Sequence, residues 1–222
     1  MLAVYLASVA TAVNQFKVPP AMQQLMADLG LDMVAAGWTM SIFSVAGIAL
    51  AIPAAFLLRR WGLKFTGVAA MGCTVAGAVL GALAPSAAVM LAARMLEGTG
   101  MGLIAIIAPA AISAWVLPGD RGMPMGIWAT WVPLGNVIMY NLAHPLMAAS
   151  SWRGVWWFGA IFAALSLVVY ALVVTEPAED VSRSSASAPA SAPAPEPEVS
   201  FGPALLNVDS WLLALIFACF AF

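Results

Sequence analysis

Apolar residues in this chain form long runs that are separated by short polar breaks. A run of about 20 apolar residues is long enough to cross a bilayer as a single α-helix. The 222-residue sequence contains six such runs and the start of a seventh. We expect membrane spans at residues 2–24, 34–58, 65–84, 88–117, 123–147 and 153–174, with the seventh beginning near residue 206. The pattern predicts an all-α membrane protein built around a six-helix bundle.

Composition supports the same conclusion. Hydrophobic residues make up 64% of the chain and charged residues only 8%, whereas a soluble domain is about 25% charged. A soluble fold of this size could not bury so much apolar surface. The net charge of −2 gives no indication of nucleic-acid binding. We therefore expect a lipid bilayer as the surroundings of the chain and no nucleic acid as a partner.

A low-complexity tract follows the sixth run. Residues 176–203 are rich in Ala, Ser, Pro and acidic residues, a composition that neither sustains a helix nor buries a core. We expect a bundle at 1–175, a flexible cytoplasmic linker at 176–205 and the start of a seventh helix at 206–222. Because the seventh run is still apolar at Phe222, we expect the chain to continue into a second six-helix bundle that is missing from this sequence.

Basic residues gather on one side of the predicted membrane. When loops are assigned alternately to the two sides, five basic residues fall on the side of the second-to-third loop and one, Arg153, falls on the other. Lys and Arg resist translocation, so the five mark the cytoplasmic side and place the N-terminus there. The five are Arg59, Arg60, Lys64, Arg121 and Arg183.

Small residues predict where the helices touch. They follow three- and four-residue steps in the second, third and fourth spans, and such faces let helix backbones approach closely in lipid. The positions are Gly37, Ser41, Ser44, Gly47, Ala51, Gly77, Gly81, Gly98 and Gly102. The spans also indicate an internal repeat. The number of residues from Pro19 to Trp38 equals the number from Pro109 to Trp128. A repeat of three plus three inverted helices is common among transporters.

The second-to-third loop carries a family motif. It runs Ala55-Phe56-Leu57-Leu58-Arg59-Arg60-Trp61-Gly62-Leu63-Lys64 and resembles the motif Gly-x-Leu-Ala-Asp-Arg-x-Gly-Arg-Lys of the major facilitator superfamily. Ala55 replaces the first glycine and Arg59 the acidic residue. The fourth span resembles the family's Arg-x-x-x-Gly-x-Gly pattern through Arg94-Met95-Leu96-Glu97-Gly98-Thr99-Gly100. The resemblance implies a gating role for Arg60, Gly62 and Lys64.

The resemblance further implies the N-terminal half of a major-facilitator fold in a bacterial cytoplasmic membrane. Within that superfamily the chain is most similar to the cyanate and nitrate/nitrite permeases. The segments that carry this likeness are Lys17-Val18-Pro19-Pro20, Ala108-Pro109-Ala110 and Arg121-Gly122-Met123-Pro124-Met125-Gly126-Ile127-Trp128. The glycine-rich nitrate signature expected in the fifth span is missing, since the segment Val132-Pro133-Leu134-Gly135-Asn136 has one glycine.

Two basic residues lie inside predicted spans, namely Lys17 in the first and Arg94 in the fourth. A cation at mid-membrane costs roughly 2.5–3.5 kcal/mol on insertion scales, so one that persists usually faces a cavity or a partner. Both fall in the outer half of the membrane, where together they would attract an anion. Alternatively, Lys17 extends to the outer surface and Arg94 pairs with Glu97, one turn away. That pair could also act as a proton-linked switch.

Other polar residues share helix faces with these candidates. Asn14 lies one turn before Lys17, which makes it a candidate substrate ligand. Asn136, Tyr140 and His144 form a polar stripe along the fifth span, which either bonds to other helices or lines a cavity, with His144 as a second proton-coupling candidate. Trp128 is a further candidate for the pore. We interpret Trp152, Trp156 and Trp157 as an interfacial belt.

These observations lead to one functional hypothesis and several alternatives. We expect a secondary active permease that carries a small anion by alternating access. The alternatives are an ion channel or pore, and a transporter of a neutral or cationic small molecule, as in drug efflux. Paired carboxylates and histidine–metal clusters are absent from the sequence pattern, so we expect no enzyme activity, no metal and no cofactor.

Overall fold

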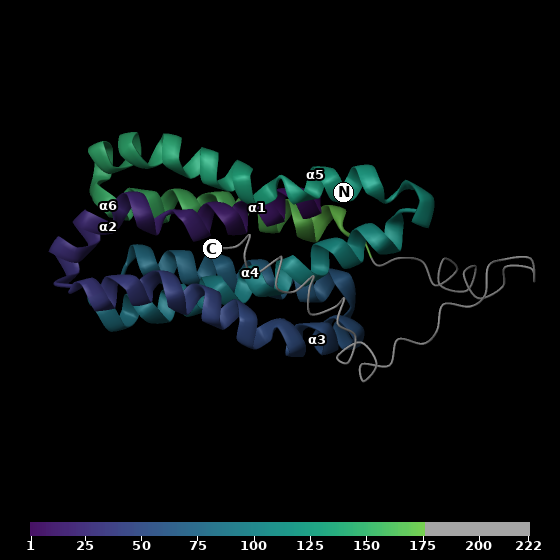
Figure 1. Ribbon diagram of the computed structural model, residues 1–222, viewed down its shortest axis with the longest axis horizontal. Coiled ribbons are helices and arrows are strands. Elements are labelled where there is room, and N and C mark those ends of the chain that lie inside the picture. Colours follow the sequence, from purple (N-terminus) through teal and green to yellow (C-terminus); the bar gives the residue numbers. More distant parts are fainter. Residues whose placement is uncertain (176–222) are drawn as a thin grey trace, which may run out of the picture. The chain divides into compact units, whose positions relative to one another are not determined.

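The computed structural model describes residues 1–175. The regular secondary structure of these residues is helical. The expected linker at 176–205 and the expected seventh helix at 206–222 lie outside the described residues. Within them no strand occurs, which confirms the all-α fold. The elements run side by side along the bundle (Figure 1). They are α1 (Leu2–Phe16), α2 (Val18–Leu29), α3 (Met33–Ala82), α4 (Ala87–Trp115), the short 3-10 helix η1 (Pro118–Asp120), α5 (Gly122–Ala129) and α6 (Trp131–Val173).

Two of these helices reverse direction partway along their length (Figure 1). Gly62 breaks α3 with φ 76° and ψ 177°, and Ser151 breaks α6 with φ 64° and ψ −176°. This backbone region is essentially reserved for glycine, because a side chain there is strained. We call residues 33–61 and 63–82 the two limbs of α3, and residues 131–149 and 152–173 the two limbs of α6. The separation of Gly62 and Ser151 along the sequence is close to the offset of the internal repeat expected from the sequence.

The limbs account for the six expected crossings. Among the described residues, the apolar segments long enough to span a bilayer lie in α3, in α4 and in the stretch Gly122–Val173. The helix α3 reverses at Gly62 and the last stretch reverses at Ser151, so each of them supplies two crossings. The first expected span is interrupted at Lys17, which leaves Leu2–Phe16 as a shorter apolar helix followed by α2.

Glycines bring α3 and α4 into backbone contact, as their spacing predicts. A Cβ added at Gly98 would lie 2.1 Å from the Phe43 carbonyl oxygen, and one at Gly102 would lie 2.7 Å from the Gly47 Cα atom. In the second limb of α3, a Cβ at Gly77 would lie 2.7 Å from the Ala93 carbonyl oxygen. The prediction is wrong for Gly37, which is exposed and has nothing within 4 Å of the added Cβ.

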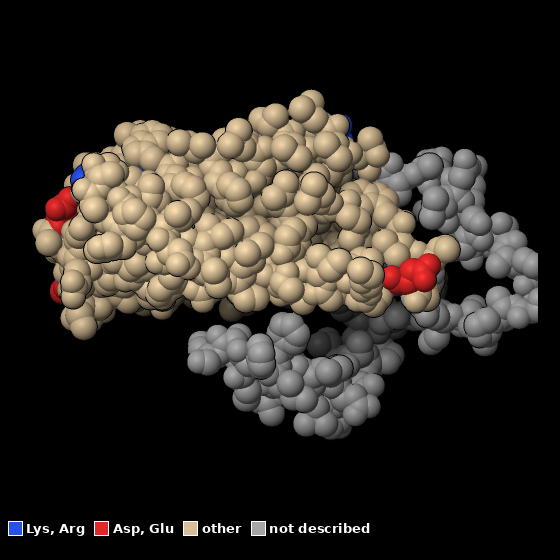
Figure 2. Space-filling view, turned by 90° about the horizontal axis from the view of Figure 1, so that it is seen from above, with Lys and Arg blue, Asp and Glu red and all other residues tan. Residues whose placement is uncertain are grey.

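The bundle buries two apolar clusters and a set of polar side chains. One cluster includes Ala7, Ile104 and Tyr170, and the other includes Leu25 and Trp152. The buried polar residues include Asn14, Lys17, Thr39, Arg94 and Glu97. On the face seen in Figure 2, charged side chains instead gather at the two ends of the bundle. Charges inside the bundle therefore need a specific explanation.

Candidate functional site

The break between α1 and α2 positions Lys17. Pro19 and Pro20 occupy the first turn of α2, and proline has no backbone N–H. The carbonyls of Gln15 and Phe16, which would accept those hydrogen bonds in an unbroken helix, therefore lack their usual partners. Lys17 lies at this junction with φ −74° and ψ −23°, and its side chain is fully buried.

Glu97 joins Lys17 to Arg94. Its Oε1 atom accepts a hydrogen bond from Lys17 Nζ, and its Oε2 atom accepts one from Arg94 Nη1. The exposed fractions of the three side chains are 0% for Lys17, 1% for Arg94 and 0% for Glu97. We call these three residues the ion-pair cluster. With two cations and one carboxylate, it carries one excess positive charge inside the bundle.

Backbone carbonyls and one side-chain amide accept further hydrogen bonds from the two cations. Arg94 Nε donates to the Thr39 carbonyl oxygen at 3.0 Å, and Nη1 donates to that of Asn14 at 2.8 Å. The Nη2 atom makes a longer contact of 3.4 Å with the Gln15 carbonyl oxygen, which the α1–α2 break leaves available. Lys17 Nζ donates to Asn14 Oδ1 at 2.8 Å. Desolvated cations of this kind are stable only when such partners replace water.

Two aromatic rings complete the surroundings of the cations. Lys17 Nζ lies 4.8 Å from the centre of the Trp156 ring, and Arg94 Cζ lies 4.3 Å from that of Phe43. Both distances fit cation–π contacts, which strengthen when water is excluded. A Cβ added at Gly81 would lie 2.3 Å from Trp156 Nε1, so this glycine leaves the space that the indole occupies. Sequence reasoning did not connect Trp156, Phe43 or Gly81 with the cations, because no local signal links them.

Asn14 is held from two sides. Its Nδ2 atom donates to the carbonyl oxygens of Ala10 and Gly159 at 2.9 and 3.2 Å, which orients Oδ1 toward Lys17. A Cβ at Gly159 would lie 2.5 Å from Asn14 Oδ1, so the second limb of α6 needs a glycine at this position. The expected proximity of Asn14 and Lys17 on one helix face is therefore present in the structure.

The structure favours one of the alternatives left open for each cation. Lys17 does not extend to the outer surface of the bundle, since its ammonium group is buried against Glu97. Arg94 pairs with Glu97 one turn along α4. Both cations are thus engaged by the protein, and direct contact with an anion stays a proposal.

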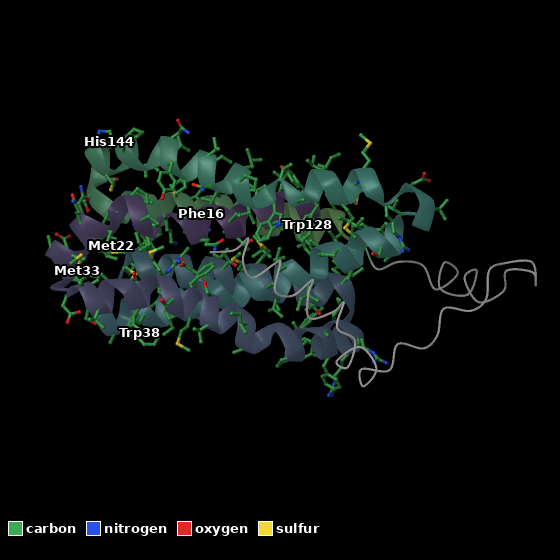
Figure 3. The ribbon with its side chains drawn as sticks, in the orientation of Figure 1. Phe16, Met22, Met33, Trp38, Trp128 and His144 are labelled. Carbon is green, nitrogen blue, oxygen red and sulfur yellow. The ribbon has the colours of Figure 1, made fainter. Side chains whose placement is uncertain are left out.

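The polar stripe on the first limb of α6 lies apart from the ion-pair cluster. Asn136 is partly buried, whereas Tyr140 and His144 are exposed. His144 lies near the end of this limb, on the outer side of the bundle (Figure 3). Within the described residues it has no hydrogen bond or ion pair, and none of the three residues makes such an interaction with Lys17, Arg94 or Glu97. Their roles in substrate binding or proton coupling remain predictions.

The prediction of an interfacial belt is wrong for two of the three tryptophans. Trp152 and Trp156 are fully buried, and only Trp157 is exposed. Trp152 Nε1 donates to Asp28 Oδ2 at 2.8 Å, and Arg153 pairs with the same carboxylate at 3.2 Å. These rings pack inward because they follow the reversal at Ser151, where the chain turns back along the bundle.

The motif loop surrounds the reversal in α3. Arg60 and Lys64 are exposed on either side of Gly62, and the second limb of α6 braces the turn, because Tyr170 donates to the Leu63 carbonyl oxygen at 2.9 Å. A Cβ at Gly67 would lie 2.1 Å from the Tyr170 hydroxyl oxygen, so this glycine makes room for the phenol. The loop is therefore held by packing, and its gating role stays a proposal.

Two hollows accompany the site among the described residues. The first, of about 290 Å³, is bounded by α1, α4 and α5 and includes Tyr5, Ile112 and Trp128 in its walls. Trp128 donates to Ser8 Oγ at 3.1 Å and lies beside α1 (Figure 3). The second, of about 300 Å³, is bounded by α1, α3 and α4 and includes Gln15 and Phe43.

A comparison with known sequences places this architecture in a family. The sequence profile of the Major Facilitator Superfamily matches residues 4–222. The chain belongs to the Major Facilitator Superfamily. This result confirms the resemblance seen in the loop motif and in the fourth span, and it makes the chain a multi-pass integral membrane protein. The family match does not show the likeness to cyanate and nitrate/nitrite permeases.

Relatives of this Major Facilitator Superfamily chain include several named transporters. It is 26% identical over 161 residues to the uncharacterized MFS-type transporter YcnB of Bacillus subtilis, covering 72% of this chain and 34% of the relative. It is 27% identical to the multidrug transporter mfsC of Aspergillus fumigatus, covering 65% and 28%. It is also 27% identical to the multidrug resistance protein B homolog of Mycobacterium tuberculosis, covering 76% and 31%. The chain spans about one third of the length of these relatives.

Solved structures of two transporters share the fold of this chain. A D-xylose-proton symporter aligns with a TM-score of 0.69 at 15% identity, covering 83% of this chain and 50% of that one. A bacterial homolog of the human lysosomal transporter Spinster aligns with a TM-score of 0.67 at 18% identity, covering 80% and 44%. At such low identity these likenesses concern the fold alone.

Proposed function

We propose that this chain forms the N-terminal bundle of a secondary active transporter that carries a small anion by alternating access. The observation that supports an anion is the ion-pair cluster. Glu97 balances only one of the two cations, and an uncompensated charge in a low-dielectric interior favours a ligand of opposite sign. A pore is less consistent with this arrangement, because the cluster is fully buried rather than strung along a channel.

The rest of the machinery follows from the same proposal. Arg94 and Lys17 attract the substrate, with Asn14 as the neutral ligand beside them, while Asn136, Tyr140 and Trp128 line its path. Glu97 and His144 are the candidates for proton coupling, and Arg60, Gly62 and Lys64 for gating on the cytoplasmic side. The second six-helix bundle would complete the transporter, and the host membrane would be the cytoplasmic membrane of a bacterium. The superfamily membership and the relatives' names support a transporter in general terms.

Uptake into vesicles that carry the full-length transporter tests the anion proposal. The panel is cyanate, nitrate, nitrite and small carboxylates, and the variants are Lys17→Ala and Arg94→Ala. We expect both variants to lose uptake while they still insert and fold. Arg153→Ala is the matched control, because it removes an exposed cation at the end of the bundle, 41% of whose side chain is accessible. Normal anion uptake by Lys17→Ala and Arg94→Ala would mean that the two charges serve structure only.

A second candidate is export of an apolar or cationic organic molecule. Two observations favour it: the multidrug names of several relatives, and the hollow of about 290 Å³ that Tyr5, Ile112 and Trp128 help to line. Export of a lipophilic dye from loaded vesicles, together with indifference to every anion in the panel, would select this function. Cation export would in addition persist or increase in Lys17→Ala, because that variant removes a repulsive charge.

A further inference from the structure

The short helix α5 is the least buried α-helix among the described residues. None of its residues is buried, and Met123 and Ile127 are 78% and 51% exposed. A Cβ added at Gly122 or Gly126 would have nothing within 4 Å. An element with few buried contacts opens at a lower free-energy cost than the core, so α5 can move while the rest of the bundle stays folded.

The chain can bend at both ends of α5. Thr130 separates α5 from α6 with φ −76° and ψ −6°. Pro133 follows in the first turn of α6 and has no N–H to donate to the Ala129 carbonyl oxygen, which weakens the helix at this turn. The Thr130 Oγ1 atom shares a hydrogen bond of 2.7 Å with the Tyr5 hydroxyl, which ties the turn to α1. Before α5, the 3-10 helix η1 contains Gly119, which also has nothing within 4 Å of an added Cβ.

A few hydrogen bonds hold α5 to its neighbours. Arg121 directly precedes α5, and its guanidinium group bonds to the C-terminal end of α4. Its Nε atom donates to the Val116 carbonyl oxygen at 3.0 Å, and Nη2 donates to that of Ser113 at 2.7 Å. At the other end of α5, Trp128 Nε1 donates to Ser8 Oγ on α1 at 3.1 Å. The arginine bonds are the stronger attachment, because their donor is charged and lies at a helix C-terminus.

The hollow of about 290 Å³ lies against α5. Met123, Pro124 and Ile127 line it from α5, and Ile112 lines it from α4. The side chain of Ile112 is only 1% exposed. Movement of α5 away from α4 would therefore open the hollow and uncover Ile112.

We infer that α5 is a lid over this hollow, which pivots at Thr130 and is held shut by the Arg121 hydrogen bonds to the end of α4. When these bonds break, the N-terminal end of α5 is released and the lid swings outward. Arg121 is one of the basic residues that mark the cytoplasmic side, so the lid opens toward the cytoplasm. The inference goes beyond the proposed function, and its test needs no substrate.

Thiol labelling of the full-length transporter tests the lid. Cys73 and Cys219 are replaced with alanine together with any other cysteine, and one cysteine is introduced as Ile112→Cys. We expect it to react slowly with N-ethylmaleimide, and at least about tenfold faster in Arg121→Gln, which loses two hydrogen bonds from a charged donor. Ile104→Cys is the matched control, because Ile104 is fully buried on the same helix and does not line the hollow.

A second variant releases the other end of α5, for the case that Arg121→Gln does not fold. Ser8→Ala removes the acceptor of the Trp128 hydrogen bond, and we expect it to speed the labelling of Ile112→Cys as well. Thr11→Ala is its control, because the Thr11 hydroxyl is buried on the same helix and donates to the Ser8 carbonyl oxygen within α1. Thr11→Ala should leave the labelling rate unchanged.

Distance measurement by pulsed electron paramagnetic resonance follows the lid directly. Spin labels are attached at Gly126→Cys on α5 and Gly72→Cys on the second limb of α3, where an added Cβ has nothing within 4 Å. We expect a second, longer distance to become populated in Arg121→Gln. A control pair at Gly72 and the exposed Ala92 of α4 should keep one distance.

Each outcome decides the inference. Faster labelling of Ile112→Cys with no change at Ile104→Cys, together with the longer distance, supports the lid. Unchanged labelling in folded Arg121→Gln and Ser8→Ala overturns it, and this is the result expected if a second bundle covers α5 and holds it in place. Equal acceleration at Ile104→Cys also overturns it, because the whole bundle is then loosened. Failure of the lid leaves the proposed anion transport intact, since no readout involves uptake.

Discussion

Replacing Glu97 with glutamine is the most direct test of the ion-pair cluster. The substitution keeps the shape of the side chain but removes the charge that Lys17 and Arg94 share. Removing one partner of a buried ion pair costs about 3–5 kcal/mol, because the other charge stays in a low-dielectric interior. Here two cations lose their counterion at once, so we expect the upper part of that range. In the longer full-length protein such a loss corresponds to a fall in Tm of several °C.

The assay is thermal unfolding of the purified full-length protein in detergent, followed by circular dichroism. Arg153→Gln serves as the control, because it breaks an ion pair whose partners are 41% and 48% exposed. Exposed pairs contribute about 1 kcal/mol or less, so its Tm should move little. Comparing the two changes in Tm separates the effect of burying the charges from the effect of losing an ion pair.

A double variant tests the cause of the loss. Lys17→Met with Glu97→Gln removes one cation together with the carboxylate, and so returns the cluster to one excess positive charge. If unpaired charge is the source of instability, the double variant is more stable than Glu97→Gln alone. The reasoning is refuted if Glu97→Gln lowers Tm no more than Arg153→Gln does, or if adding Lys17→Met lowers Tm further.

Three backbone positions give further predictions, each measured as a change in Tm. Gly77→Ala should lose about 1–3 kcal/mol of stability, as overpacked sites do, since its Cβ would lie 2.7 Å from Glu97 Cγ. Gly72→Ala on the same limb, with nothing within 4 Å, is the control, and an equal loss there would contradict the packing argument. Ser151→Gly should raise stability by about 1 kcal/mol because it relieves a backbone region that costs 1–3 kcal/mol for non-glycine residues; a lower Tm would contradict this. Gly62→Ala should lose a similar amount by creating the same strain in α3, and an unchanged Tm would show that the turn tolerates a side chain.

Most of the fold was predictable because hydrophobic runs and small-residue spacing are local signals. The reversals at Gly62 and Ser151 fall inside the expected loops between runs. The prediction was wrong for Gly37, because spacing alone does not say which part of a small-residue face meets a neighbouring helix. The interfacial belt was wrong for Trp152 and Trp156, because the amphipathic character of tryptophan fits both a membrane interface and a buried hydrogen bond to Asp28.

The site was predictable only in part. Charge inside an apolar run identified Lys17 and Arg94, and spacing on α4 offered Glu97 as a partner for Arg94. The contact between Lys17 and Glu97 joins helices that are distant in sequence, so no local pattern could supply it. The aromatic partners of the cations were missed for the same reason, since their positions depend on how the limbs pack.

The ion-pair cluster also bears on how the membrane potential would act on transport. A charge that crosses the full potential gains or loses about 2.3 kcal/mol per 100 mV. In the proposed cycle the empty carrier bears the excess positive charge of Lys17, Arg94 and Glu97, whereas a bound monovalent anion brings the site to neutrality. The loaded carrier would then reorient without net charge movement, and only the return of the empty carrier would produce a current. Electrical recordings during anion uptake should accordingly assign the voltage dependence to the step that follows release of the substrate.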